Sequence, residues 1–146
     1  MPRPRSLLAL VICAAVGCSL PVTTLEAYRS KAADAAQEVV SQVRTAILTA
    51  HLAGQDRLLS SAVAVQLKDA GKAAAKAVES FASVQPPDAR ADELRARILP
   101  LLQRASDAIT RMRFAARRED MAAVLHVRSS LIEPADVLDR WAELAA

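Results

Sequence analysis

Residues 85–88 read Gln-Pro-Pro-Asp, and this stretch separates two helical halves of the chain. Two successive prolines end a preceding helix, because proline has no backbone N–H and disfavours helical geometry in the residue before it. Asp88 then offers a side-chain oxygen to cap the helix that follows. We therefore predict a rigid hinge here, between two helical hairpins.

Downstream of the hinge, apolar residues recur every three or four positions, which is the spacing of a helix with one buried face. The pattern predicts helices over 89–117 and 120–145, with Asp120 at the start of the second. Pro100 and Pro134 fall inside these helices, where we expect bends and not breaks. The predicted buried residues are Leu94, Ile98, Leu101, Ala105, Ala108, Met112 and Ala115 in the first, and Val124, Val127, Leu131, Ala135, Leu138, Ala142 and Ala145 in the second.

Upstream of the hinge, the same spacing predicts helices over 24–53 and 57–83. The first opens with the capping-box pattern Thr-Thr-Leu-Glu at 23–26, whose first residue is the predicted cap. Gly54 is a natural terminator because glycine adopts the left-handed conformation that ends many helices, and Asp56 is a natural cap for the next helix. The predicted buried residues are Leu25, Tyr28, Ala32, Ala35, Val39, Val43, Ala46 and Ala50 in the first, and Leu59, Val63, Leu67, Ala70, Ala74, Ala77 and Phe81 in the second.

The composition favours helices over strands. Alanine occurs 32 times in the 146 residues, glycine three times and aromatic residues only four times. Alanine is the strongest helix former, whereas sheets are enriched in β-branched and aromatic residues. Together with the similar helix lengths and short connections, this predicts an all-α fold, an antiparallel up-down-up-down four-helix bundle over 24–146.

Residues 1–20 have the layout of a secretory signal peptide. Arg3 and Arg5 precede ten uninterrupted apolar residues, 7–16, and small residues follow just before Cys18. The layout predicts export, with 1–17 as the signal peptide.

The four residues Ala15-Val16-Gly17-Cys18 resemble the lipobox of bacterial lipoproteins. In that family the cysteine becomes the first mature residue and carries lipid, although leucine is commoner at the position of Ala15. The resemblance implies that Cys18 is lipidated and that 18–23 is a short tether, so the membrane is the implied partner. Cys18 is also the only cysteine left after cleavage, so it has no disulfide partner, and lipidation accounts for it.

Two other outcomes stay open at this point. An ordinary signal peptidase accepts the same small-residue triplet, which would give a freely secreted protein. An uncleaved segment would make a single-pass membrane protein, but the apolar run spans about 16 residues before Thr23 and contains Pro21. A spanning helix needs about 20 residues.

The net charge argues against nucleic acid as a partner. The whole chain has a formal charge of +3 and a pI near 9.2. Removing 1–17 takes away Arg3 and Arg5 and leaves 17 basic and 16 acidic residues. A nearly neutral domain lacks the electrostatic footprint of a nucleic-acid binder.

The sequence contains no catalytic or metal-binding motif. His51 and His126 do not belong to the Glu-x-x-His pairs that hold di-iron centres in bundles, and no Cys-x-x-Cys-His haem signature occurs. No serine lies in a Gly-x-Ser-x-Gly turn. We therefore expect neither an enzyme nor a cofactor.

Arginines recur every seven residues along the predicted third helix, flanking its buried face. Their aliphatic stems can cover the edge of the core while the guanidinium groups pair with carboxylates on a neighbouring helix. The functional alternative is a basic stripe that contacts anionic lipid headgroups or an acidic envelope polymer. The five positions are Arg90, Arg97, Arg104, Arg111 and Arg118.

These observations lead to the expectation of an exported, lipid-anchored bundle that is a binding or structural module of the cell envelope. The alternatives are a carrier that holds a small apolar ligand between helices splayed by Pro100 and Pro134, and a single-pass protein that interacts at the membrane surface. The ligand or protein partner is not specified by any motif.

Overall fold

The computed structural model describes residues 22–145, with side chains described to residue 143, and this part of the chain forms four helices. They are α1 (Leu25–Ala53), α2 (Ser60–Ala82), α3 (Ala89–Arg117) and α4 (Met121–Ala145). The predicted signal peptide and Cys18 lie outside the described residues, as does most of the tether predicted over 18–23. None of the described helices is long and apolar enough to cross a membrane.

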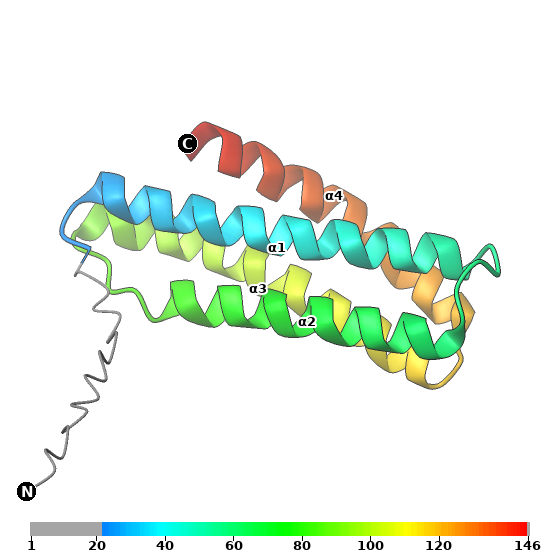
Figure 1. Ribbon diagram of the computed structural model, residues 1–146. Helices are drawn as coiled ribbons and strands as arrows, with labels where there is room; N and C mark the ends of the chain where they lie inside the picture. Colours follow the sequence, from blue (N-terminus) through cyan, green and yellow to red (C-terminus); the bar gives the residue numbers. More distant parts are fainter. Residues whose placement is uncertain (1–21, 146) are drawn as a thin grey trace, which may run out of the picture.

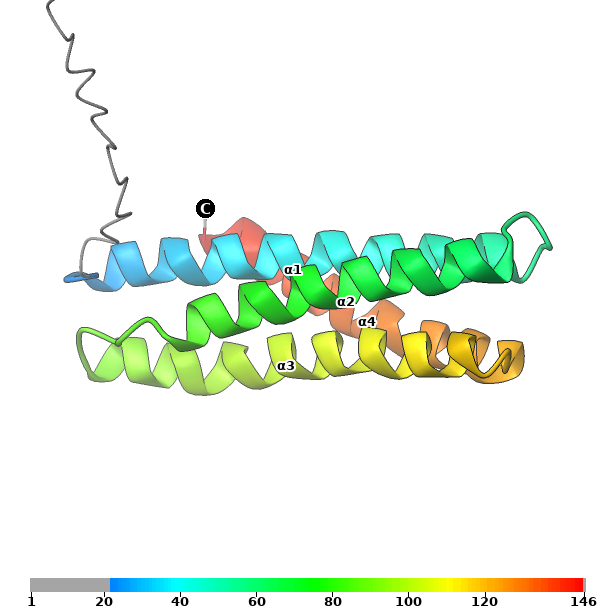
Figure 2. The same ribbon diagram turned by 60° about the horizontal axis from the view of Figure 1, so that its bottom comes forward.

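The helices run alternately up and down as an antiparallel bundle, which confirms the predicted fold class (Figures 1 and 2). The start of α1, the α2–α3 loop and the start of α3 lie at one end, called the near end here (Figure 1). The α1–α2 and α3–α4 turns lie at the opposite end, the far end. The chain therefore enters the bundle at the near end.

The two diagonally opposite pairs of helices, α1 with α3 and α2 with α4, differ in how closely their backbones approach. The α-carbons of α1 and α3 come within 8 Å of each other across the centre, whereas those of α2 and α4 do not within the described chain. Small side chains explain the close diagonal, because alanines such as Ala46 on α1 and Ala105 on α3 are fully buried and let backbones approach. Helix α4 crosses the other helices obliquely (Figure 2).

The core follows the predicted periodicity in most positions. Its largest fully buried side chains come from all four helices, and Leu102 is among them while the predicted Leu101 is only partly buried. Leu59, also predicted to be buried, is 77 % exposed. The fully buried large side chains are Tyr28, Val39, Val43, Val63, Leu67, Ile98, Leu102, Ile109, Met112, Val124, Leu131 and Leu138.

Helix α1 begins one residue later than the capping box predicts. Thr24, not Thr23, is the N-cap, and its hydroxyl oxygen accepts a hydrogen bond from the N–H of Ala27 at 3.1 Å. Glu26 stays in the first turn, where the positive end of the helix dipole favours a carboxylate.

The α1–α2 turn differs from its prediction in three ways. Gly54 has right-handed φ and ψ of −67° and −11°, and the residue with positive φ, 55°, is Asp56. Asp56 therefore lies in the turn that follows α1 and does not cap α2, which begins only at Ser60. The N–H of Arg57 donates to the carbonyl of Leu52 at 2.9 Å and so closes the turn after α1, and Leu58 packs against the core. Leu59 is still extended, with φ −68° and ψ 143°, and is the N-cap of α2.

A different property makes Gly54 suitable at the end of α1. A β-carbon on this residue would lie 3.2 Å from Cδ2 of Leu125 on α4. Glycine at this position thus leaves room for the side chain of Leu125 on α4. The sequence suggests instead that glycine is needed here for a left-handed backbone conformation, which Gly54 does not adopt.

The second half of the chain matches its prediction closely. Asp88 caps α3 by accepting from the N–H of Ala91 at 2.8 Å, and Asp120 caps α4 by accepting from Ala123 at 2.9 Å. Pro100 and Pro134 both lie inside continuous helices.

Candidate functional site

The five regularly spaced arginines all lie exposed on α3 or at its C-cap. A seven-residue step on a straight helix falls about 20° short of two full turns. Over four steps the stripe therefore rotates by about 80°, from the edge of the buried face at Arg90 to the outward face at Arg118.

None of these five arginines pairs with a carboxylate in the part of the chain that the structure describes. The ion pairs there are Lys31 with Asp34 and Arg44 with Asp139. Arg104 instead donates from Nε to the carbonyl oxygen of Pro100 at 3.2 Å. The inter-helix pairing suggested by the sequence is thus not formed, and the guanidinium groups stay available to solvent or to a partner.

The densest part of this surface is at the far end, where residues 111–118 read Arg-Met-Arg-Phe-Ala-Ala-Arg-Arg. Phe114 is 48 % exposed there, which is unusual for a large aromatic side chain. Of its four helical neighbours three and four positions away, Arg111, Arg117 and Arg118 are cationic, and the fourth is Thr110. We call this group the far-end patch; it consists of Arg111, Arg113, Phe114, Arg117 and Arg118.

Arg113 differs from the other arginines of the far-end patch because it lies over the ring of Phe114. It is partly buried, and its guanidinium carbon lies 5.7 Å from the ring centroid of Phe114. At that distance the cation is attracted to the face of the ring. The contact holds an aromatic side chain at the surface beside a positive charge. The heptad pattern missed Phe114, Arg113 and Arg117 because they do not share its period, but the local density of arginine around one phenylalanine is visible in the sequence.

Charge is distributed unevenly among the helices. Helix α3 carries seven arginines against three carboxylates, whereas α4 carries two arginines against four carboxylates. The described chain is therefore nearly neutral as a whole, although α3 by itself has a net positive charge. Such asymmetry produces a local positive potential even when net charge is small.

The near end uses an arginine for a structural purpose. Arg95 on α3 donates to the carbonyl oxygens of Ala82 at 2.6 Å and Val84 at 3.1 Å. Ala82 is the last residue of α2, so its carbonyl has no partner within that helix. Arg95 thereby fixes the α2–α3 loop to the start of α3.

Beside Arg95, an aromatic pair closes the core at the near end. The rings of Tyr28 and Phe81 lie 5.4 Å apart at 48°. The Tyr28 hydroxyl is buried and has no hydrogen-bond partner within the described residues. Burial raises the pKa of the Tyr28 phenol, and the positive charge of Arg95 partly opposes that rise.

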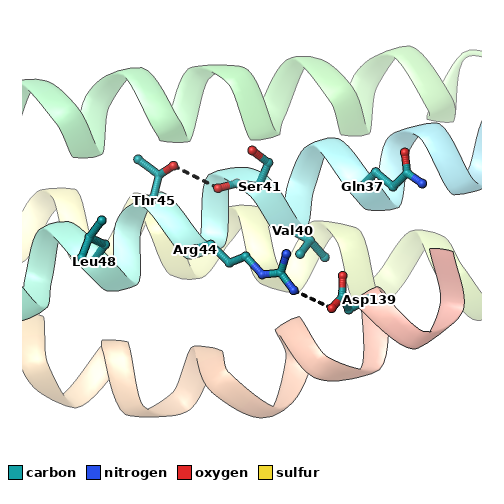
Figure 3. Close-up of a pocket in the computed structure, with 7 residues that line it drawn as sticks. All are labelled: Gln37, Val40, Ser41, Arg44, Thr45, Leu48 and Asp139. Carbon is teal, nitrogen blue, oxygen red and sulfur yellow. Dashed lines mark hydrogen bonds and ion pairs between the residues drawn. The ribbon is translucent and has the colours of Figure 1, made fainter. Parts of the chain in front are cut away.

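An open groove of about 400 Å³ lies between the outer face of α1 and α4 (Figure 3). Arg44 reaches from α1 to Asp139 on α4 and forms an ion pair at 2.5 Å, while Thr45 donates to the carbonyl of Ser41 at 3.0 Å. Leu48 lies at the other end of the groove. Arg44 and Asp139 pair with each other, and the other polar side chains converge on no common point, so the groove offers no assembled binding chemistry.

No three histidine, cysteine, aspartate or glutamate side chains gather into a metal-binding group within residues 22–143. Nε2 of His51, near the end of α1, lies 3.2 Å from Nε2 of Gln55 in the α1–α2 turn. In the described chain, the far-end patch and the arginine stripe are therefore the strongest candidates for a functional surface.

Comparison with known proteins gives no match, whether with family models, curated proteins or solved structures.

Proposed function

We propose that the chain is an exported lipoprotein whose four-helix bundle serves as a binding or structural module at a membrane surface in the cell envelope. The observation that carries this proposal is the leader, in which a short apolar run ends at the lipobox-like Ala15-Val16-Gly17-Cys18. Lipid on Cys18 would hold the domain at the membrane, since two acyl chains suffice for stable anchoring.

The short distance from Cys18 to the bundle supports a role close to the membrane. Val22 is partly buried and packs against the hydrophobic core. Four residue steps separate it from Cys18, and a fully extended chain covers about 14 Å over that number. The domain would sit directly at its anchor and not on a long stalk.

The exposed cations of α3 favour a binding role. Several guanidinium groups without carboxylate partners give a surface suited to an anionic partner. A carrier of small apolar ligands is less well supported, because the centre of the bundle is filled by fully buried side chains such as Leu67, Leu102 and Leu131. Native mass spectrometry distinguishes the two, since a carrier would retain a ligand.

The test compares two cysteine variants in a host that processes lipoproteins. The native chain should be found in the membrane fraction, and Cys18→Ser should shift it to the soluble exported fraction or leave it as an uncleaved precursor. Cys13→Ser is the matched control, because this cysteine belongs to the same leader but is removed with it. The proposal is wrong if the two substitutions have the same effect, or if Cys18→Ser changes neither processing nor location.

A further inference from the structure

We propose that the far-end patch docks onto the anionic leaflet of the membrane that carries the lipid anchor, so that the bundle lies along the membrane with α3 toward the lipid. This inference rests on the proposed function and adds to it the partner, the contact surface and the orientation.

The charge of the patch specifies an anionic partner. Arg111, Arg117 and Arg118 are exposed and have no carboxylate within ion-pairing distance in the described chain. A cation near an anionic lipid surface strengthens binding by roughly 1 kcal/mol, which is about five-fold per residue. Three such residues together are expected to contribute about 100-fold.

The exposed ring at the centre of the patch favours a bilayer over a soluble acidic polymer. Phe114 is about half exposed, and arginines lie three positions before it and three and four positions after it on the same helix. An aromatic side chain among cations suits the membrane interface, where the ring enters the acyl boundary while the guanidinium groups stay with the headgroups. A flexible polyanion in water offers the ring no comparable apolar environment.

The dimensions of the molecule determine the orientation. Helix α3 has 29 residues, which corresponds to about 44 Å at 1.5 Å per residue. The segment from Cys18 to Val22 extends at most about 14 Å and joins the bundle at the near end. A bundle standing upright on its anchor would hold the far-end patch well away from the lipid. The patch reaches the same membrane only when the bundle lies flat, and the anchor and the patch then act as two linked attachment points.

The test uses the chain without its leader, so that lipidation plays no part. A chain that begins at Ser19 keeps all the buried residues of the described chain, which lie between Tyr28 and Ala142. Its helicity and cooperative melting are checked first. Binding is then measured by sedimentation with vesicles of phosphatidylglycerol and phosphatidylcholine in equal parts, and with vesicles of phosphatidylcholine alone, at low and at physiological salt. We expect binding only to the anionic vesicles, and weaker binding at the higher salt concentration.

The decisive variant carries Arg111→Gln, Arg117→Gln and Arg118→Gln, and its binding should fall by about 100-fold. The matched control carries Arg29→Gln, Lys76→Gln and Arg140→Gln, which removes the same charge from exposed positions on the other three helices. Its binding should change by less than about three-fold. Equal losses in the two variants would show attraction to net charge alone and would overturn the proposal.

Phe114→Ala tests the choice of partner. It keeps every charge, and we expect it to weaken vesicle binding about ten-fold at both salt concentrations while the melting temperature confirms that the chain is folded. If Phe114→Ala binds vesicles normally, or if the chain prefers soluble polyglutamate to anionic vesicles, the patch does not recognise a bilayer. Because no lipidated protein is used, failure here is distinguishable from failure of the Cys18 test.

Discussion

The two ends of the bundle use arginine in opposite ways. At the near end, Arg95 is partly buried and donates to two backbone carbonyls, so its charge is used to fix a loop. At the far end, Arg117 and Arg118 are exposed and pair with no carboxylate in the described chain. The side chain is the same, but Arg95 lies within hydrogen-bonding reach of the carbonyl at the C-terminus of α2, whereas the guanidinium groups of Arg117 and Arg118 donate to no group in the described chain. Arg95 is therefore structural, and Arg117 and Arg118 are available for binding.

The two turns of the far end are closed by hydrogen bonds of their own backbone, without an arginine side chain. Asp56 and Glu119 both have positive φ, 55° and 57°. In each turn a hydrogen bond spans five residues, from Arg57 to Leu52 and from Asp120 to Ala115. This is the arrangement that usually contains glycine.

Among the substitutions that compare the two ends, replacement of an arginine should produce the largest difference in the free energy of unfolding. Arg95→Ala leaves the carbonyls of Ala82 and Val84 without a charged donor, and we expect the free energy of unfolding to fall by about 3 kcal/mol. Arg117→Ala should cost less than about 1 kcal/mol, chiefly through its interaction with the helix dipole. Urea denaturation of both variants provides the measurement, and equal losses would remove the distinction.

The aspartate caps should behave alike at both ends. Asp88→Ala removes the acceptor for Ala91 at the near end, and Asp120→Ala removes the acceptor for Ala123 at the far end. Each should lower the free energy of unfolding by about 1 kcal/mol. Thermal melts of the two variants check this, and a near-end loss several times the far-end loss would mean that Asp88 has a role beyond capping.

The far-end turns should gain stability from glycine. Glu119→Gly relieves the cost of a left-handed backbone for a residue with a β-carbon, and the expected gain is about 0.5 to 1 kcal/mol. Asp56→Gly should gain less, because aspartate tolerates this conformation better than glutamate. Chemical denaturation distinguishes these values, and a clear loss of stability in both variants would contradict the assigned turn geometry.

The smallest effect concerns the near-end aromatic pair. Tyr28→Phe removes a buried hydroxyl that has no partner in the described chain, so stability at neutral pH should be unchanged or rise by at most about 1 kcal/mol. Burial raises the pKa of Tyr28 in the folded state. The unfolded chain therefore loses this proton first, and stability should fall as the pH rises above about 10. Melting from pH 8 to pH 11 should show a steeper fall for the native chain than for Tyr28→Phe, and parallel curves would contradict this.

The two turns also show what sequence reasoning can and cannot recover. Asp120 was predicted to cap a helix and does so, because the next residue already begins α4. Asp56 has the same chemistry but lies four residues before α2, since Leu58 must first reach the core. A cap is recognisable from residue type, but its register depends on tertiary contacts that local sequence does not contain.

The candidate surface was predictable in outline. The seven-residue repeat of arginine identified α3 as the cationic helix, and that repeat lies in the sequence itself. What the sequence did not show is that these arginines lack carboxylate partners, because that depends on which faces of α2 and α4 are turned toward α3. Phe114 lies outside the seven-residue repeat, and its exposure is a property of the packed bundle that the repeat does not indicate.

The central claim, that the chain is anchored through lipid on Cys18, is tested most directly by the intact mass of the mature protein extracted from membranes. The account predicts a chain that begins at Cys18 and carries the added mass of a diacylglyceryl group, with or without a further acyl chain on the amine. A mass that retains Met1, or a mature chain with unmodified Cys18, would contradict it.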